Sequence, residues 1–154
     1  MDLSPGMAKR ARSSWPSALI CVGDIEHLPF RDSVFHGVIC AEVLQYFNGA
    51  KDALFEMTRV LKSGGVLVVL TLNGELLIRK IKKLLRKPRI RDYSMEEIRS
   101  LLSDLGMRIG LAGFLVMFPS FSIAISSKLA ERFGNCFFIL VIKPLGPGGS
   151  KRAL

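Results

Sequence analysis

The sequence is poor in cysteine and in C-x-x-C spacings, and it has no apolar segment at its N-terminus. Only three of its 154 residues are cysteine, namely Cys21, Cys40 and Cys136, and they lie far apart. This number and spacing argue against a disulfide framework and against a zinc site, and they favour a reducing compartment such as the cytoplasm. The N-terminal residues MDLSPGMAKRARSS do not resemble a secretory signal, so export is not expected.

Acidic side chains are scarce in the second half of the chain. Residues 1–70 carry seven basic and seven acidic side chains, whereas residues 71–154 carry fifteen basic and six acidic ones, so the whole net charge of +9 lies in the second half. The segment from Arg79 to Arg91 alone holds eight basic residues and no acidic residue. The charge is therefore a local feature and does not by itself define an anionic partner for the whole chain.

What is abundant is apolar sequence, at 49% of residues, which is enough for the core of one globular domain. Ser4 and Pro5 begin a predicted short helix that reaches about Arg12. The apolar runs from Ala18 to Val22 and from Gly37 to Ala41 are both predicted to be buried strands.

A helix is predicted from Ala50, because Ala53, Leu54, Met57, Val60 and Leu61 form an apolar stripe. Ser63, Gly64 and Gly65 are expected to end this helix. The apolar run Val66 to Leu72 that follows does not alternate, which predicts a strand covered on both faces. A helix leading into a buried strand is typical of α/β proteins.

The sequence Ser94-x-x-Glu97 is a capping box that predicts a helix ending near Gly106. Strands are expected at Met107–Met117 and Cys136–Ile142, with a short helix near residues 127–133 between them. Residues 109–127 carry no charge and are long enough for a membrane span, which we keep as an alternative, although their glycines and proline favour strands and loops.

Two motifs together resemble those of class I S-adenosylmethionine-dependent methyltransferases of the type 11 group. The first is Gly23 to Phe30 (GDIEHLPF), followed by Phe35 and the strand Val38 to Leu44. The second is Glu56 to Gly65 (EMTRVLKSGG), which is similar to the family's E-x-x-R-V-L-K-P-G-G. With residues 2–7 resembling the end of the family's second strand, the similarity extends to about residue 143.

The resemblance implies a Rossmann-like, doubly wound α/β sheet that binds S-adenosylmethionine across the carboxyl ends of its strands. By the same resemblance, Asp2 would hold the ribose hydroxyls and Asp24 would accept a hydrogen bond from the adenine amino group. The backbone N–H of Ile25 would face the adenine ring, and Glu42 would line the reactive end. No catalytic base is identified, because His27 and His36 are candidates by residue type alone.

The sequence departs from the family's pattern at its beginning and at one further position. None of its 14 glycines forms the glycine-rich loop that follows the family's first strand, and His36 replaces an acidic residue. We therefore expect an incomplete sheet that lacks the first strand and most of the second, in a truncated product, a remnant or one piece of a longer protein. The expected organisation is a partial domain at residues 1–143, with a basic helical insertion at about 75–91 and a flexible tail at 144–154.

The resemblance predicts an enzyme that transfers a methyl group to an unidentified acceptor. The alternative is a non-catalytic remnant that acts as an interaction or membrane-surface module. Arg79 to Arg91 could contact an anionic membrane, and nucleic acid is the less favoured partner because no aromatic residues interleave there. The exposed sheet edge predicts self-association as a further property.

Overall fold

The computed structural model describes residues 1–47, 49–73, 91, 93–117, 122–125 and 136–146. The predicted basic helix apart from Arg91, the predicted short helix near residues 127–133 and all but the first three residues of the predicted tail lie outside the described residues.

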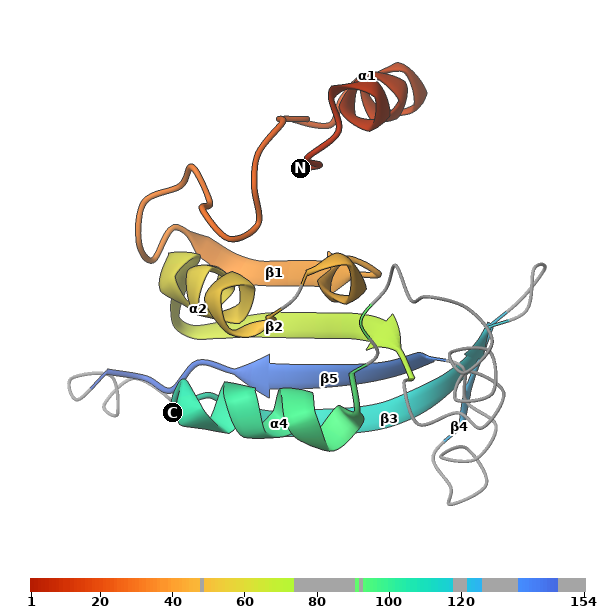
Figure 1. Cartoon of the computed structure of the whole chain (residues 1–154). Coiled ribbons are helices and arrows are strands. Elements are labelled where there is room, and N and C mark those ends of the chain that lie inside the picture. Colours follow the sequence, from red (N-terminus) through yellow and green to blue (C-terminus); the bar gives the residue numbers. More distant parts are fainter. Residues whose placement is uncertain (48, 74–90, 92, 118–121, 126–135, 147–154) are drawn as a thin grey trace.

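Within the described residues, five strands form one mixed sheet in the order β1-β2-β5-β3-β4 (Figure 1). The strands are β1 (Phe35–Ala41), β2 (Leu61–Leu72), β3 (Arg108–Met117), β4 (Ser122–Ile125) and β5 (Cys136–Ile142). β1 is parallel to β2, whereas the pairs β2 with β5, β5 with β3 and β3 with β4 are antiparallel. The predicted α/β, Rossmann-like fold class is confirmed.

Helices α2 (Lys51–Val60) and α4 (Met95–Asp104) cover one face of this sheet (Figure 1). Their apolar sides bury Leu54, Met57, Ile98 and Leu102 against strand residues such as Leu67. A short 3-10 helix, η1 (Leu44–Tyr46), follows β1. Helix α1 (Pro5–Ser14) lies apart from the sheet, on an N-terminal arm that we define as residues 1–30 (Figure 1).

The predicted helices at α1 and α4 are confirmed, and both begin with the capping contact expected from the sequence. The Ser4 hydroxyl accepts a hydrogen bond from the Met7 N–H at 3.4 Å, and the Ser94 hydroxyl accepts one from the Glu97 N–H at 3.0 Å. Gly106, at φ 74°, follows α4 in the left-handed conformation that often ends helices. These contacts involve residues close in sequence, which is why the sequence predicts them well.

The prediction of a buried strand at Ala18–Val22 is wrong. This segment forms only one parallel bridge, between Val22 and Asp2, and Leu19 is fully exposed. A strand that belongs inside a parallel sheet needs a partner along each edge, and here Asp2 alone pairs with it. The second predicted strand is present as β1, but Cys40 is the only residue of β1 that is buried.

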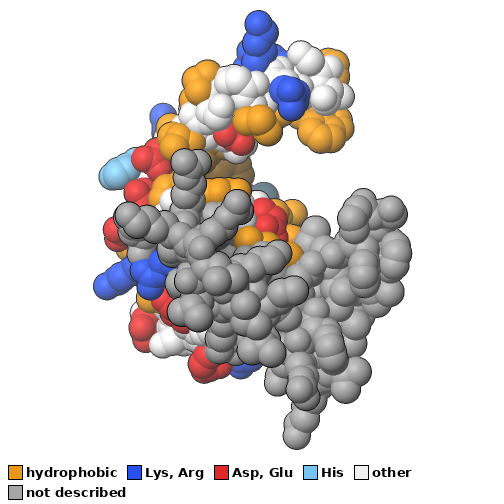
Figure 2. Space-filling view, turned by 45° about the vertical axis from the view of Figure 1, so that its right-hand side comes forward, with side chains coloured by type: hydrophobic (Ala, Val, Ile, Leu, Met, Phe, Trp, Pro, Cys, Tyr) orange, Lys and Arg blue, Asp and Glu red, His pale blue; other side chains and the backbone are white. Residues whose placement is uncertain are grey.

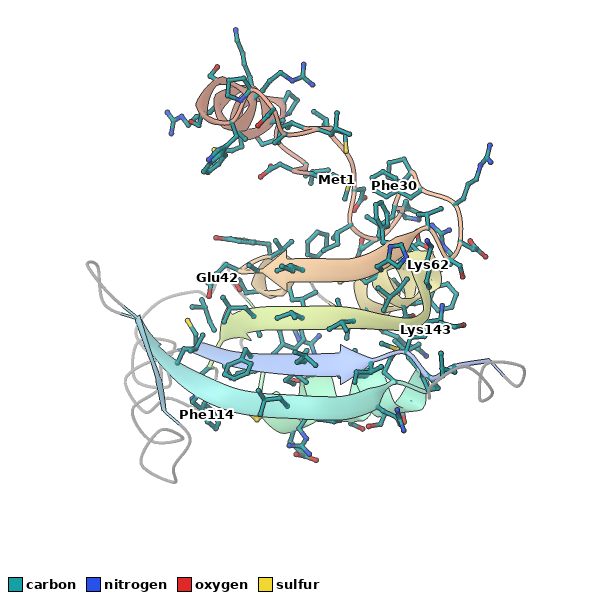
Figure 3. The ribbon with its side chains drawn as sticks, turned by 180° about the vertical axis from the view of Figure 1, so that it is seen from behind. Met1, Phe30, Glu42, Lys62, Phe114 and Lys143 are labelled. Atoms are coloured by element: carbon teal, nitrogen blue, oxygen red, sulfur yellow. The ribbon has the colours of Figure 1, made fainter. Side chains whose placement is uncertain are left out.

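Two expectations about β2 are also wrong. Helix α2 ends at Val60 and β2 begins at Leu61, so Ser63 to Gly65 are part of the strand. Gly64 adopts a φ of 76° there, and its N–H donates to the Lys143 carbonyl at 2.8 Å. Buried and half-buried residues alternate along β2, because α2 and α4 cover one face and no described helix covers the other (Figure 3).

The uncharged segment 109–127 contains strands where the structure describes it. Its first part lies in β3, and its later part includes β4, a strand that the sequence did not predict. Among the described residues, no helix combines the length and apolar character needed to cross a membrane.

Candidate functional site

A groove of about 1030 Å³ separates the N-terminal arm from the edge of β1. One wall comes from the arm and includes Met1, Leu3 and Leu19, while the other includes Ile39 and Val43. Figure 2 shows the arm standing off from the rest of the chain, with hydrophobic and acidic side chains beneath it. The structure therefore brings residues that are distant in sequence to one open site.

Asp2 lies in this groove on the arm side. Its N–H donates to the Cys21 carbonyl at 3.2 Å, and its carbonyl accepts from the Gly23 N–H at 3.1 Å, so the backbone is anchored to the chain beside it. One carboxylate oxygen, Oδ1, accepts the Ser4 N–H at 2.8 Å. The side chain is exposed, so this carboxylate can accept further hydrogen bonds from a ligand in the groove.

Asp24 and Ile25 form the turn at the base of the arm. Oδ1 of Asp24 accepts the Glu26 N–H at 2.9 Å, and Oδ2 lies 3.7 Å from Nδ1 of His27. Ile25 lines the groove, whereas Asp24 is not among the residues that line it. Asp24 therefore shapes the turn that presents Ile25, and its predicted contact with adenine stays a prediction.

Glu42 follows the last residue of β1 and lines the same groove (Figure 3). Its φ is 57°, an unusual conformation for a residue other than glycine, and its N–H donates to the Leu70 carbonyl at 2.9 Å. Oε2 accepts a hydrogen bond from Nε2 of Gln45 at 3.0 Å, and Oε1 accepts a hydrogen bond from Sγ of Cys136 at 3.3 Å. Buried polar groups thus hold the Glu42 carboxylate at the carboxyl end of β1. Residues in a strained backbone conformation, as Glu42 is, are often found at functional sites.

Gln45 is the residue that fixes this arrangement, and the sequence did not identify it. Its side-chain oxygen accepts the Thr71 hydroxyl at 3.0 Å, while its side-chain nitrogen donates to Glu42. Both Gln45 and Thr71 are buried. The sequence does place Gln45 three residues after Glu42, at the end of a strand. Its pairing with Thr71, however, arises only when the chain folds, because the two residues are far apart in sequence.

The charge of the groove is acidic, although the chain as a whole is basic. Among the described residues that line it, Asp2 and Glu42 carry the charged side chains, and none of these lining residues is lysine or arginine. A groove of this kind disfavours phosphate groups and suits a ligand with hydroxyl donors and a positive charge. S-adenosylmethionine has two ribose hydroxyls, and its sulfonium and ammonium groups outweigh its single carboxylate, so its net charge is positive and it fits that description.

Arg59, in the second motif, fastens the arm's base to α2. Its Nη1 donates to the Phe30 carbonyl at 2.9 Å and its Nη2 donates to the Leu28 carbonyl at 3.1 Å. The Glu56 carboxylate accepts a hydrogen bond from Nε of Arg59 at 2.6 Å and another from the Leu28 N–H at 2.8 Å. We call these contacts the Arg59 clamp. Because Leu28 and Phe30 line the groove, the clamp sets the position of one wall.

The clamp makes the stability of the domain depend on pH. Hydrogen bonds from Arg59 hold the pKa of the Glu56 carboxyl below its ordinary value, despite an opposing effect of burial. Because the folded-state pKa is depressed, this contribution is present above the unfolded-state pKa of about 4.3 and is lost as the pH falls through the folded-state pKa.

We expect Glu56→Gln to lower the free energy of unfolding by about 1–2 kcal/mol at pH 7 and by less at pH 3. The reason is that glutamine keeps one acceptor but not the charge, and the wild-type charge itself is lost in acid. Urea unfolding at both pH values measures the difference. Glu96→Gln, at a side chain that is 87% exposed, is the control and should change little. An equal loss at both pH values would contradict the role of the charge.

The two histidines lie in different places. His27 is exposed beside Asp24, and His36 lies near the start of β1, where its Nε2 is 3.1 Å from Nζ of Lys62. Glu42 follows the opposite end of β1, so His36 is remote from the predicted reactive end. Neither histidine lines the groove.

All three cysteines lie within the described residues, and none of them forms a disulfide. Burial raises the pKa of Cys40 to about 12, which keeps this thiol protonated and unreactive at neutral pH. Cys136 is also buried, and it donates to Glu42. Cys40 therefore contributes packing to the groove and is not a nucleophile.

Strand order and site together define a Rossmann-like α/β domain with a ligand groove at the end of β1. Residues 1–69 match the family described as "Methyltransferase domain". A structure of an S-adenosylmethionine-dependent methyltransferase from Thermotoga maritima superposes with a TM-score of 0.74 at 22% identity, over 92% of this chain and 70% of that one. The match over residues 1–69 and the shared fold confirm the predicted resemblance to methyltransferases of this family.

Two relatives extend the similarity beyond those residues. A protein of Methanocaldococcus jannaschii named as uncharacterised is 34% identical over 68% of this chain and 47% of its own length. The malonyl-[acyl-carrier protein] O-methyltransferase of Geobacter sulfurreducens is 32% identical over 70% of this chain and 45% of its own length. The chain therefore spans about half the length of these relatives. The cofactor that the family and the solved structures imply is S-adenosylmethionine.

Proposed function

We propose that this chain binds S-adenosylmethionine in the groove between the arm and β1 and takes part in methyl transfer to an acceptor that enters near Glu42. The observation that carries the proposal is the charge of the described side chains that line the groove, which include the carboxylates of Asp2 and Glu42 and no lysine or arginine, in a chain of net charge +9. The family match over residues 1–69 supports it further, and cysteines outside any disulfide suit a reducing cytoplasm as the place where it acts.

Each proposed residue has a defined chemical task. Asp2 accepts hydrogen bonds from ribose hydroxyls, and Ile25 packs against the adenine while its N–H faces the ring. Glu42, fixed by Gln45 and Cys136, attracts the positive charge and holds the reacting end in place. S-adenosylmethionine supplies a methyl group bound to a sulfonium, so alignment with the acceptor is the main requirement on the protein.

The affinity of the 154 residues alone should be weak. The groove is open, the adjacent edge of β1 is unpaired among the described residues, and the family's glycine-rich loop is not in this sequence. We expect a dissociation constant on the order of 1 mM. Micromolar affinity would show that these missing contacts matter less than proposed.

Saturation-transfer NMR with S-adenosylmethionine tests the proposal, because it detects binding in the millimolar range. Glu42→Ala and Asp2→Ala should each weaken binding by about fivefold, which corresponds to loss of about 1 kcal/mol. Glu96→Ala, on the exposed side of α4, is the matched carboxylate control and should bind like the wild type. If no transfer is seen at several millimolar, or if both groove variants bind normally, the proposed function is wrong.

A further inference from the structure

The 3-10 helix η1 lies at the proposed site but has little local support of its own. It spans only Leu44 to Tyr46, and among the described residues no side chain caps its start. Tyr46 and the two residues that flank η1, Val43 and Phe47, line the groove. A 3-10 helix of this length has weak internal hydrogen bonds, so contacts from other elements determine where it lies.

Two of these contacts come from the segment that leads into α4. The N–H of Arg91 donates to the Gln45 carbonyl at 2.8 Å. The Tyr93 hydroxyl donates to the Phe47 carbonyl at 3.1 Å. Gln45 is the middle residue of η1 and Phe47 follows its last residue, so this segment holds η1 at two points.

Tyr93 is itself held firmly in place. It is 1% exposed, and its backbone forms a parallel bridge with Asn73, directly after β2. The guanidinium of Arg91 lies 4.8 Å from the centre of the tyrosine ring and donates to Glu97 of α4 at 2.8 Å. A cation over an aromatic ring is an attractive contact that restricts the ring. Tyr93 therefore fixes η1 relative to both β2 and α4.

The position of η1 in turn determines that of the carboxylate at the reacting end. Gln45 donates to Glu42 and accepts from Thr71 of β2, so it can join the two only while η1 keeps its place beside β2. Glu42 has a φ of 57°, a conformation that the surrounding structure has to maintain. A series of contacts thus leads from Tyr93 through η1 to Glu42.

We propose that Tyr93 is a positioning residue for the reacting end of the groove and acts through its hydrogen bond to η1. Tyr93 does not line the groove, so its effect on a ligand is indirect. Asp2 and Ile25, which we assign to the adenosine part of the ligand, belong to the N-terminal arm and not to η1. The inference rests on the proposed function and predicts that Tyr93 affects the binding of one end of the ligand only.

Tyr93→Phe removes the hydroxyl and keeps the ring, so the variant should fold. Saturation-transfer NMR compares its affinity for S-adenosylmethionine and for 5′-methylthioadenosine, which has the adenosine part without the sulfonium or the amino-acid part. We expect S-adenosylmethionine to bind about threefold more weakly, because binding must restore a position of η1 that the wild type already holds. The affinity for 5′-methylthioadenosine should not change.

Thr58→Val is the matched control. The Thr58 hydroxyl is also a buried donor to a main-chain carbonyl, that of Phe55 at 2.8 Å. Thr58 belongs to α2 and does not line the groove. Its loss should therefore leave the affinity for both ligands as in the wild type.

Amide exchange without ligand tests the hold on η1 independently of binding. The N–H groups of Tyr46 and Phe47 donate to the carbonyls of Val43 and Leu44, so their exchange reports the opening of η1. We expect exchange at these two amides to accelerate by about threefold or more in Tyr93→Phe. Thr58→Val should leave it unchanged.

Three results would overturn the proposal. The first is equal weakening of both ligands by Tyr93→Phe, since that would indicate general loosening of the domain. The second is an unchanged affinity for S-adenosylmethionine, and the third is unchanged exchange at Tyr46 and Phe47. If the wild type binds neither ligand, the proposed function is wrong, whereas the exchange rates still show whether Tyr93 holds η1.

Discussion

Replacing Arg59 with glutamine is expected to release the base of the N-terminal arm from α2. Arg59 bonds the carbonyls of Leu28 and Phe30 and also contacts Glu56 and Asp32, so the shorter glutamine side chain cannot replace these contacts together. We expect amide exchange at Leu28 and Phe30 to accelerate by about tenfold or more, as local opening no longer has to break the clamp. NMR measurement of the amide hydrogen-exchange rates at Leu28 and Phe30 tests this expectation.

The matched control for the clamp is Arg99→Gln on α4. Arg99 makes only a 4.0 Å ion pair with Glu96 at the surface, so its loss should leave Leu28 and Phe30 unchanged. Exchange in β5 should also be unaffected in both variants, because the clamp does not touch that strand. Equal effects of the two substitutions would mean that Arg59 acts through general charge and not through its contacts.

Leu54→Ala should cause the largest loss of stability. Leu54 is completely buried between α2 and the sheet, and truncation of such a leucine removes apolar contacts and leaves a cavity. The expected decrease in the free energy of unfolding is about 2–5 kcal/mol. Urea unfolding of the variant and the wild type measures this decrease.

The adjacent residue on α2 is the control for Leu54. Phe55 is 52% exposed, and Phe55→Ala removes a larger side chain from the surface of the same helix. Its effect in urea unfolding should be below about 1 kcal/mol. If Phe55→Ala destabilised the domain as much as Leu54→Ala, the assignment of the buried face of α2 would be wrong.

The sequence predicts the elements whose signals are local. The serine caps of α1 and α4, Gly106 at the end of α4 and the apolar run of β5 all appear as expected. The segment Ala18–Val22 has strand composition as well, yet it forms a single bridge. Strand formation depends on partners, and residue composition does not show whether a partner is present.

The candidate site was predictable only in part, for a related reason. The resemblance named Asp2, Asp24, Ile25 and Glu42, and three of these four line one groove. The roles of Gln45 and Arg59 depend on contacts with Thr71, Leu28 and Phe30, which are distant in sequence. Those contacts could be found only in three dimensions.

Mapping S-adenosylmethionine by its effect on backbone amide shifts tests the central claim most directly. The account predicts shifts that grow with ligand concentration at Gly23, Ile25 and Glu42, all of which line the groove. Amides of β3 around Ile109 should not move. Absence of shifts at the groove, or shifts confined to other parts of the chain, would contradict the claim that this groove is the cofactor site.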